Sequence, residues 1–206
     1  MAEAKTKKNI NYDDLLLGLC DSVSGVIAAA TGHTATYAPM VQRITKTTLT
    51  PDIGTFVMFT GSFSGMVVIN FPKETAMELY ANYMSAMGIP EKDQAKNYTS
   101  EEVSNALGEL MNQILGNFTK AVNDKLHTSI TQSQPKMLAL PRELQISISV
   151  NLDTPRYSKV TFTTEGSNVF FLELAMDNAE FDLVREFEEH RSLTPDEILA
   201  AYSIKK

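Results

Sequence analysis

Three polar side chains, Asn105, Glu109 and Asn112, recur at helical spacing within residues 99–126 and are the strongest candidates for chemistry in this chain. Residues three or four apart lie on one face of a helix. One rigid element would therefore offer a partner two short amides and a carboxylate together. Because residue types at one spacing are a weak signal, a solvated polar face is the simpler interpretation of this pattern alone.

The helix that would position them is predicted by an apolar stripe on its opposite side. At about 100° per residue, the members of this stripe fall within roughly 80° of one another: Val103, Leu107, Leu110, Ile114, Phe118 and Ala121. Thr99 and Glu102 have the spacing of a capping box, which predicts that the helix begins there.

Two glycines, Gly108 and Gly116, lie in or beside the polar face of this predicted helix. A glycine inside a helix costs about 1 kcal/mol relative to alanine, so some other interaction should offset the cost. Either another element of the chain packs against the bare backbone, or the face is kept low so that a partner can approach Glu109 and Asn112.

The remaining pattern predicts an α+β fold, an α/β sandwich in which helices pack on a largely antiparallel sheet. Further helices are expected over 11–31, capped by Asn11 and ended by Gly32, and over 73–87. The stretch 33–49 is expected to be extended, with a bend at Pro39. The expected strands are 55–60 and 66–71, which form a hairpin, then 127–132, 144–152, 157–164 and 169–174, of which the last three form a meander.

The chain divides into three predicted parts. Residues 1–10 are expected to be a disordered basic tail, and residues 11–177 to be the folded domain. Residues 178–206 form a C-terminal extension with two short amphipathic helices, at about 179–190 and 194–202. This extension could dock on the sheet of its own domain or offer a surface to a partner.

Composition excludes several classes of function. A net charge of −7 argues against a nonspecific nucleic-acid surface. The single cysteine, Cys20, cannot form an intrachain disulfide and is expected to be a small core residue of a cytoplasmic protein. The three histidines are far apart, so no metal site is expected. No uninterrupted apolar run approaches the roughly 18 residues of a membrane span, so no membrane association is expected.

The motif Asn105-x3-Glu109-x2-Asn112-x22-Pro135 resembles the signature of the CheC/CheX family of chemotaxis phosphatases. In that signature an Asp or Ser opens the motif, and Glu, Asn and Pro follow with the same gaps. Four positions at fixed separations are much more specific than Glu and Asn alone. The glycine before Glu109 and the one four residues after Asn112 also resemble the family's helix.

One copy of the motif makes the chain more similar to CheX than to CheC, which carries two. At the corresponding spacing, the first predicted helix has Asp13-x3-Leu17-x2-Cys20, which lacks both functional side chains. Met111 stands where the family usually has glycine, which predicts a bulky side chain beside the site. The extension after residue 177 has no counterpart in CheX.

The resemblance implies a phosphatase that hydrolyses the phospho-aspartate of a response-regulator receiver domain such as CheY. Asn112 would hold the attacking water, and Glu109 would pair with the receiver's lysine. Support for the motif would come from Asn105, Gly108, Gly116 and Pro135. The protein would need no cofactor of its own, because the receiver carries the Mg²⁺, and it would be a homodimer. The alternative is a catalytically inactive, dimeric CheX-like scaffold in chemotaxis or another two-component pathway.

Overall fold

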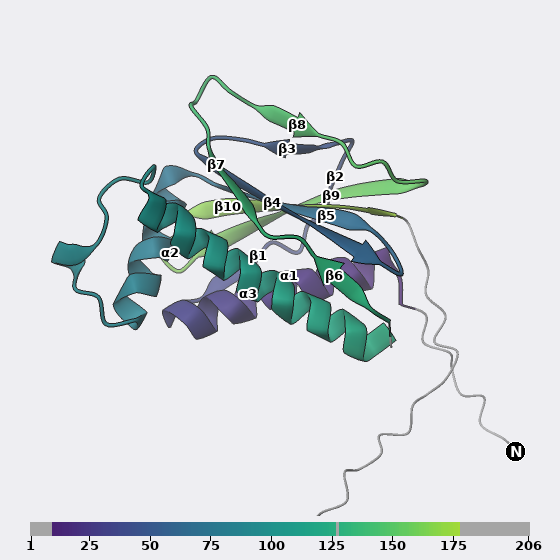
Figure 1. The fold of residues 1–206 in the computed structure, drawn as a ribbon, viewed down its shortest axis with the longest axis horizontal. Helices are drawn as coiled ribbons and strands as arrows, with labels where there is room; N and C mark the ends of the chain where they lie inside the picture. Colours follow the sequence, from purple (N-terminus) through teal and green to yellow (C-terminus); the bar gives the residue numbers. More distant parts are fainter. Residues whose placement is uncertain (1–9, 127, 178–206) are drawn as a thin grey trace, which may run out of the picture.

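Helices cover one face of an eight-stranded antiparallel sheet, and a separate strand pair lies over the other face (Figure 1). The structure is a computed structural model that describes residues 10–126 and 128–177. This arrangement confirms the expected α+β class. The predicted C-terminal extension lies outside the described residues, as does the predicted basic tail except for Ile10, which is buried in the core.

The elements follow the chain as three α-helices and ten strands within the described residues. The helices are α1 (Tyr12–Thr31), α2 (Lys73–Ala86) and α3 (Glu101–Leu126), with a short 3-10 helix η1 (Glu91–Asp93) before α3. The central path of the large sheet is β1 (Ala35–Tyr37), β9 (Pro155–Thr164), β10 (Val169–Asp177), β5 (Gly65–Phe71), β4 (Ile53–Gly61) and β6 (Ile130–Gln132). In addition, β2 (Gln42–Ile44) pairs with β9, and β7 (Lys136–Ala139) pairs with β4. The separate pair is β3 (Thr47–Leu49) with β8 (Ile146–Ile148).

Local hydrogen bonds explain where the helices begin. Asn11 Oδ1 accepts from the backbone N–H of Asp13 and Asp14 at 2.8 and 3.2 Å, and Asp14 accepts from the backbone N–H of Asn11, so the predicted cap of α1 is confirmed. The predicted start of α3 is wrong by one residue. Ser100, not Thr99, caps it, with Ser100 Oγ accepting from the backbone N–H of Val103 at 3.3 Å.

The sheet separates two apolar layers because successive side chains of a strand point to opposite faces. In β5, Val67 and Ile69 belong to the large core beneath the helices. The alternate residues Met66 and Val68 belong to a smaller core that β3 and β8 cover from the other side. Since both faces of β5 are buried, this strand forms the centre of the molecule.

Two strand predictions need correction. The last three expected strands do not form a meander, because β8 pairs with β3 and only β9 and β10 form a hairpin. The sequence analysis also missed β7, which pairs with β4 directly after Pro135. Period-two alternation indicates that one side of a strand is buried, but it does not specify the strand's partner. The 55–60 and 66–71 hairpin is confirmed as β4 and β5.

Helix α1 is the one described helix that is long and apolar enough, by length and composition, to cross a membrane. Its apolar side is nevertheless occupied within the fold, since Leu16, Leu19, Val23 and Ile27 are buried in the large core. Core helices of globular proteins pass the same test of length and composition.

Arg156 joins the first turn of α1 to the sheet. Its guanidinium donates to both carboxylate oxygens of Asp13 and lies 4.3 Å from the centre of the Tyr12 ring. The Tyr12 hydroxyl in turn donates to the carbonyl oxygen of Leu174 at 3.1 Å. The start of α1 is therefore fixed to both β9 and β10, close to the end of β10.

A buried acid, Glu173, lies on the opposite face of β10, beneath β3. Its side chain accepts from the backbone N–H of Thr48 at 2.8 Å and lies 3.4 Å from Lys159 Nζ. Burial raises the pKa of Glu173, and the Thr48 N–H and the Lys159 ammonium oppose this rise only in part.

The raised pKa predicts how the contribution of Glu173 to the free energy of unfolding changes with pH. Because the folded protein holds this proton more tightly than the unfolded chain, its contribution to the free energy of unfolding is full below the ordinary pKa of 4.5. The contribution is lost as the pH rises through the folded pKa. Glu173→Gln removes this titration, so the fall in Tm from pH 4.5 to pH 7 should be smaller in the variant.

Thermal unfolding at both pH values checks this expectation. Glu143→Gln is the matched control, because it makes the same change in charge at an exposed position. An equal or steeper fall in Tm for Glu173→Gln would contradict the proposed cost of burying this carboxylate.

Candidate functional site

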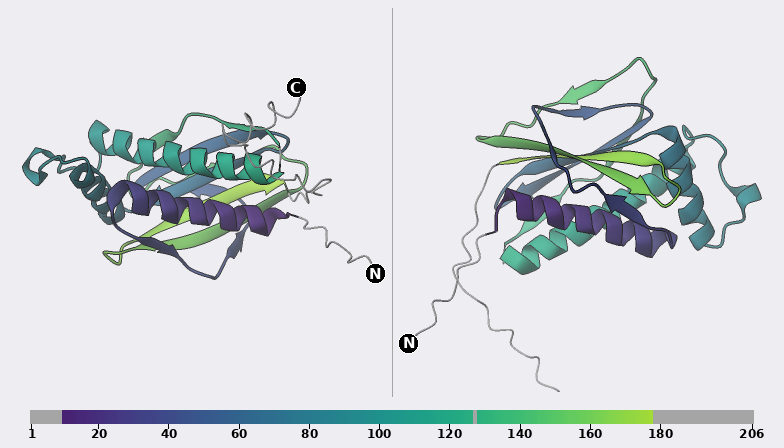
Figure 2. Two further views of the ribbon diagram at one scale, coloured as in Figure 1. Left: turned by 90° about the horizontal axis from the view of Figure 1, so that it is seen from below. Right: turned by 180° about the vertical axis from the view of Figure 1, so that it is seen from behind.

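The exposed face of α3 carries all three polar residues of the motif. Asn105, Glu109 and Asn112 are exposed within the described part of the chain. On the opposite side, five members of the predicted apolar stripe are buried, and the sixth is half-buried: Val103, Leu107, Leu110, Ile114 and Phe118, followed by Ala121. The helix lies beside α1 in the layer that covers the sheet (Figure 2). Its periodicity therefore predicted correctly which side faces outward.

The two candidate catalytic residues, Glu109 and Asn112, differ in their hydrogen bonds. The Glu109 carboxylate accepts from Gln113 Nε2 at 3.1 Å, one helical turn away. The side chain of Asn112 makes no hydrogen bond to another described residue, so both its donor and its acceptor face solvent. Sequence analysis missed Gln113, although its i+4 spacing from Glu109 is a recognisable signal.

The two glycines of α3 have different surroundings. A Cβ on Gly108 would lie 3.7 Å from Met137 Cγ of β7, which is ordinary van der Waals contact. A Cβ on Gly116 would meet no atom of the described residues within 4 Å. Thus β7 packs against the backbone at Gly108, and the helix surface at Gly116 is open. The contact with Met137 could not be predicted, because β7 itself was not.

Pro135 is brought to the same level of the molecule as Asn112. The strands β6 and β7 run along α3 in the opposite direction, with Gln132 Oε1 bonded to Thr119 Oγ1 at 3.2 Å and Met137 opposite Gly108 (Figure 1). The eleven helical residues and the five extended residues between these two contacts both span about 17 Å. Pro135 divides the extended path from Gln132 to Met137 in about the same proportion as Asn112 divides the helical path from Thr119 to Gly108. Pro135 therefore lies beside the turn that carries Asn112.

The chain at Pro135 is held in place by β4. The backbone N–H of Ser133 donates to the carbonyl oxygen of Met58 at 2.8 Å, and Ser133 Oγ accepts from the backbone N–H of Met58 at 3.1 Å. Proline has no N–H to donate, so pairing with β4 is interrupted at Pro135 and resumes at Lys136. The break separates β6 from β7.

Met111 does not lie beside the exposed motif, and the expectation of a bulky neighbour there is wrong. Its side chain is only 1% exposed and belongs to the large core. At 100° per residue, Met111 is rotated by about 100° from Asn112, which is enough to turn it inward. A methionine at this position fills the interior and does not obstruct the outer face of α3.

The corresponding positions of α1 form a different surface. Leu17 is exposed and apolar, whereas Cys20 is buried, as the sequence predicted. Burial, together with the smaller effect of the nearby Asp21 carboxylate, raises the pKa of the Cys20 thiol to about 12, so Cys20 is not an activated nucleophile. Among residues 10–126 and 128–177, no three His, Cys, Asp or Glu side chains gather as a metal site requires.

Comparison with solved structures identifies the fold. CheX from Desulfovibrio desulfuricans covers 80% of this chain and 99% of its own, with a TM-score of 0.65 and 15% identity. A CheC-like superfamily protein from Shewanella sp. PV-4 covers 82% of this chain and 99% of its own, with a TM-score of 0.62 and 16% identity. A CheX in complex with CheY, BeF3 and Mg²⁺ from Borrelia burgdorferi covers 80% and 98%, with a TM-score of 0.54 and 15% identity.

The fold is therefore that of the CheX and CheC-like chemotaxis proteins. A family model described as "Protein of unknown function (DUF3334)" matches residues 6–206, and the chain belongs to this family. The match includes the extension that follows β10. A search of curated proteins found no matching sequence.

The open space at Gly116 predicts that this glycine is not needed for packing. Gly116→Ala should raise the free energy of unfolding by about 0.5–1 kcal/mol, because alanine restricts the unfolded chain and favours the helix. Gly65→Ala is the contrasting variant, since a Cβ there would lie 2.3 Å from Phe59 Cζ and 2.6 Å from the carbonyl oxygen of Ala175. Gly65→Ala should lower the free energy of unfolding by about 1–3 kcal/mol.

Denaturant unfolding of both variants provides the measurement. Destabilisation by Gly116→Ala would mean that the bare backbone of α3 makes a packing contact after all, outside the described residues or with a second chain.

Proposed function

We propose that this protein is a CheX-like phosphatase that hydrolyses the phospho-aspartate of a response-regulator receiver domain. The observation that carries the proposal is that one rigid helix presents Glu109 and Asn112 to solvent, with Pro135 at the level of Asn112. A cytoplasmic location and a homodimer belong to the same proposal. The spacing of the sequence motif supports the proposal as well, since Asn105, Glu109, Asn112 and Pro135 match the gaps of the CheC/CheX signature.

A receiver domain is the partner that the comparison favours. The structure from Borrelia burgdorferi holds a CheX of this fold together with CheY, BeF3 and Mg²⁺. A protein with the same fold can thus bind a response regulator. For the present chain, the exposed motif on α3 is the surface that would meet the receiver.

The proposed chemistry needs few groups because phosphoryl transfer depends mainly on positioning and electrostatics. An acyl phosphate has a good leaving group, and the receiver would supply the Mg²⁺ and a lysine that neutralise the phosphoryl oxygens. The Asn112 amide would hold a water molecule in line with the phosphorus atom. It would orient this water without removing its proton.

Glu109 would anchor the complex by pairing with the receiver's lysine. Its present partner, Gln113, is an uncharged donor at an exposed position, and an ammonium group makes a stronger, charge-assisted hydrogen bond to a carboxylate. Exchange of Gln113 for the lysine would therefore favour docking. Since Glu109 and Asn112 are three residues apart on one helix, insertion of α3 would bring both side chains to the receiver at the same time.

Asn112→Ala should abolish any acceleration of phosphate loss from a phosphorylated receiver. Because the side chain is exposed and unbonded to described residues, the Tm should stay close to that of the parent. Single-turnover dephosphorylation, run across the receivers of the same genome, measures this effect. Lys120→Ala, also exposed on α3, is the matched control and should retain activity.

Glu109→Gln should act on binding more than on chemistry. Loss of one charge-assisted hydrogen bond, worth about 1.5–3 kcal/mol, should raise the KM for the phosphorylated receiver by roughly 10- to 100-fold. The fall in kcat should be much smaller. If kcat falls and KM stays the same, Glu109 does not anchor the receiver.

The alternative, a CheX-like scaffold without catalysis, predicts another pattern. It would bind a receiver carrying a phosphate mimic, but no phosphorylated receiver would lose phosphate faster, and binding would be insensitive to Asn112→Ala. That combination of results would replace the enzymatic proposal.

A further inference from the structure

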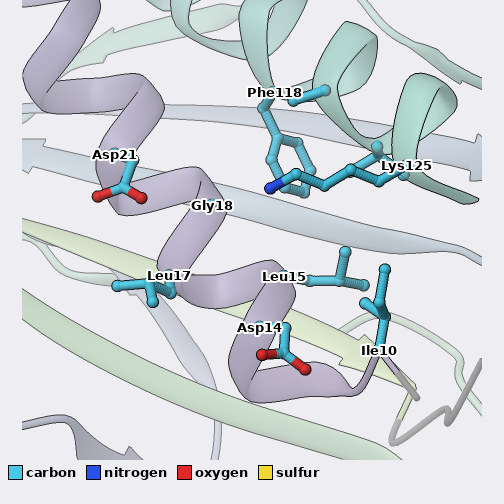
Figure 3. Close-up of a pocket in the computed structure, with 10 residues that line it drawn as sticks. Ile10, Asp14, Leu15, Leu17, Gly18, Asp21, Phe118 and Lys125 are labelled. Carbon is cyan, nitrogen blue, oxygen red and sulfur yellow. The ribbon is translucent and has the colours of Figure 1, made fainter. Parts of the chain in front are cut away.

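An apolar groove with a volume of about 380 Å³ lies between α1 and α3, away from the motif residues (Figure 3). Its floor includes Leu15 and Gly18 from α1 and Phe118 and Val122 from α3. Within residues 10–126 and 128–177, a Cβ on Gly18 would meet no atom within 4 Å, so these residues leave the helix surface open at this point. The groove can therefore admit a side chain from another segment.

Leu17 extends this groove over the outer face of α1. It is 51% exposed, and it also lines a second apolar cavity of about 350 Å³ between α1, the chain after β1, and β9. Val41, beside this second cavity, is 43% exposed, and its neighbour Met40 is 80% exposed. Clustered apolar side chains of this kind usually mark a site of interaction. We call the two cavities together with Leu17 the α1 groove.

The described chain ends close to the α1 groove. Asp177 closes β10, where its carboxylate accepts from the backbone N–H of Thr154 at 3.0 Å. The preceding residue, Met176, pairs with Arg156, whose guanidinium binds Asp13 in the first turn of α1. Asp177 therefore lies next to the start of α1, where Ile10 and Asp14 line the groove.

We propose that the C-terminal segment 179–190 of the same chain occupies the α1 groove. Phe181, Val184 and Phe187 recur three residues apart in this segment, as the buried side of a helix does. Phe181 is the fourth residue after Asp177, and four extended residues reach about 14 Å, so the first aromatic ring can enter the groove directly.

Charges of both signs line the groove and the segment. At the groove, Lys125 extends across Phe118, and the carboxylates of Asp14 and Asp21 lie along α1 (Figure 3). The segment has one arginine, Arg185, among acidic residues. Its acidic residues suit Lys125, and Arg185 suits the two aspartates.

This inference does not depend on the proposed phosphatase activity. The groove includes Phe118, Val122 and Lys125 from α3, which all lie beyond Asn112 along the helix. A segment bound there leaves Glu109 and Asn112 exposed. Its role is to cover apolar surface that would otherwise face water, and so to stabilise the domain.

Disulfide formation in the full-length chain tests the proposal. Leu17→Cys is combined in turn with Phe181→Cys, Val184→Cys and Phe187→Cys. In the control pairs, Met87→Cys replaces Leu17→Cys. Met87 is as exposed as Leu17, at 52%, but lies at the end of α2. Buried Cys20, with its raised pKa, should not compete. At least one Leu17→Cys pair should form an intrachain disulfide tenfold faster than its control.

Two outcomes would overturn the proposal. A disulfide between chains would show that a second copy of the chain occupies the groove. Equal rates of intrachain disulfide formation for Leu17→Cys and Met87→Cys would indicate that a different protein occupies it. Amide hydrogen exchange gives a second measurement without new cysteines. Leu17→Asp should speed exchange in residues 179–190 at least tenfold, and Met87→Asp should leave it unchanged.

Discussion

Burial of one side of α3 against the sheet is the constraint on which the rest of the candidate site depends. The helix loses its stability unless residues such as Leu107, Ile114 and Phe118 leave water, since helices in proteins are stabilised mainly by packing an apolar face. Once that side is fixed, the rotation of the helix is fixed as well. Asn105, Glu109 and Asn112 must then point away from the core, and no separate interaction is required to orient them.

A strand beside the helix completes this arrangement. The chain from β6 to β7 lies between α3 and β4, and it is tied to both by Thr119 on one side and Met58 on the other. Pro135, the fourth member of the motif, follows Asn112 by 23 residues in the sequence but lies near it in space. The chain turns back after the end of α3, and β6 and β7 then run along the helix toward its start.

Much of this fold could be predicted from the sequence, because local rules govern helix caps, apolar stripes and hairpins. The cap at Asn11 and the outward face of α3 are examples. Pairing between distant segments could not be predicted, so the partnership of β3 with β8 and the position of Met137 opposite Gly108 were missed. Met111 was misplaced for a related reason: its neighbour in sequence is a motif residue, whereas its neighbours in space are core residues.

The break at Pro135 also affects how other chains can approach this edge of the sheet. An unbroken edge strand exposes a row of N–H and C=O groups and invites any extended chain to add to the sheet. Pro135 removes one donor from that row and limits the strands on either side to three and four residues. A visiting protein therefore finds little backbone to pair with here, and recognition along this border must come from side chains, including those of the neighbouring α3.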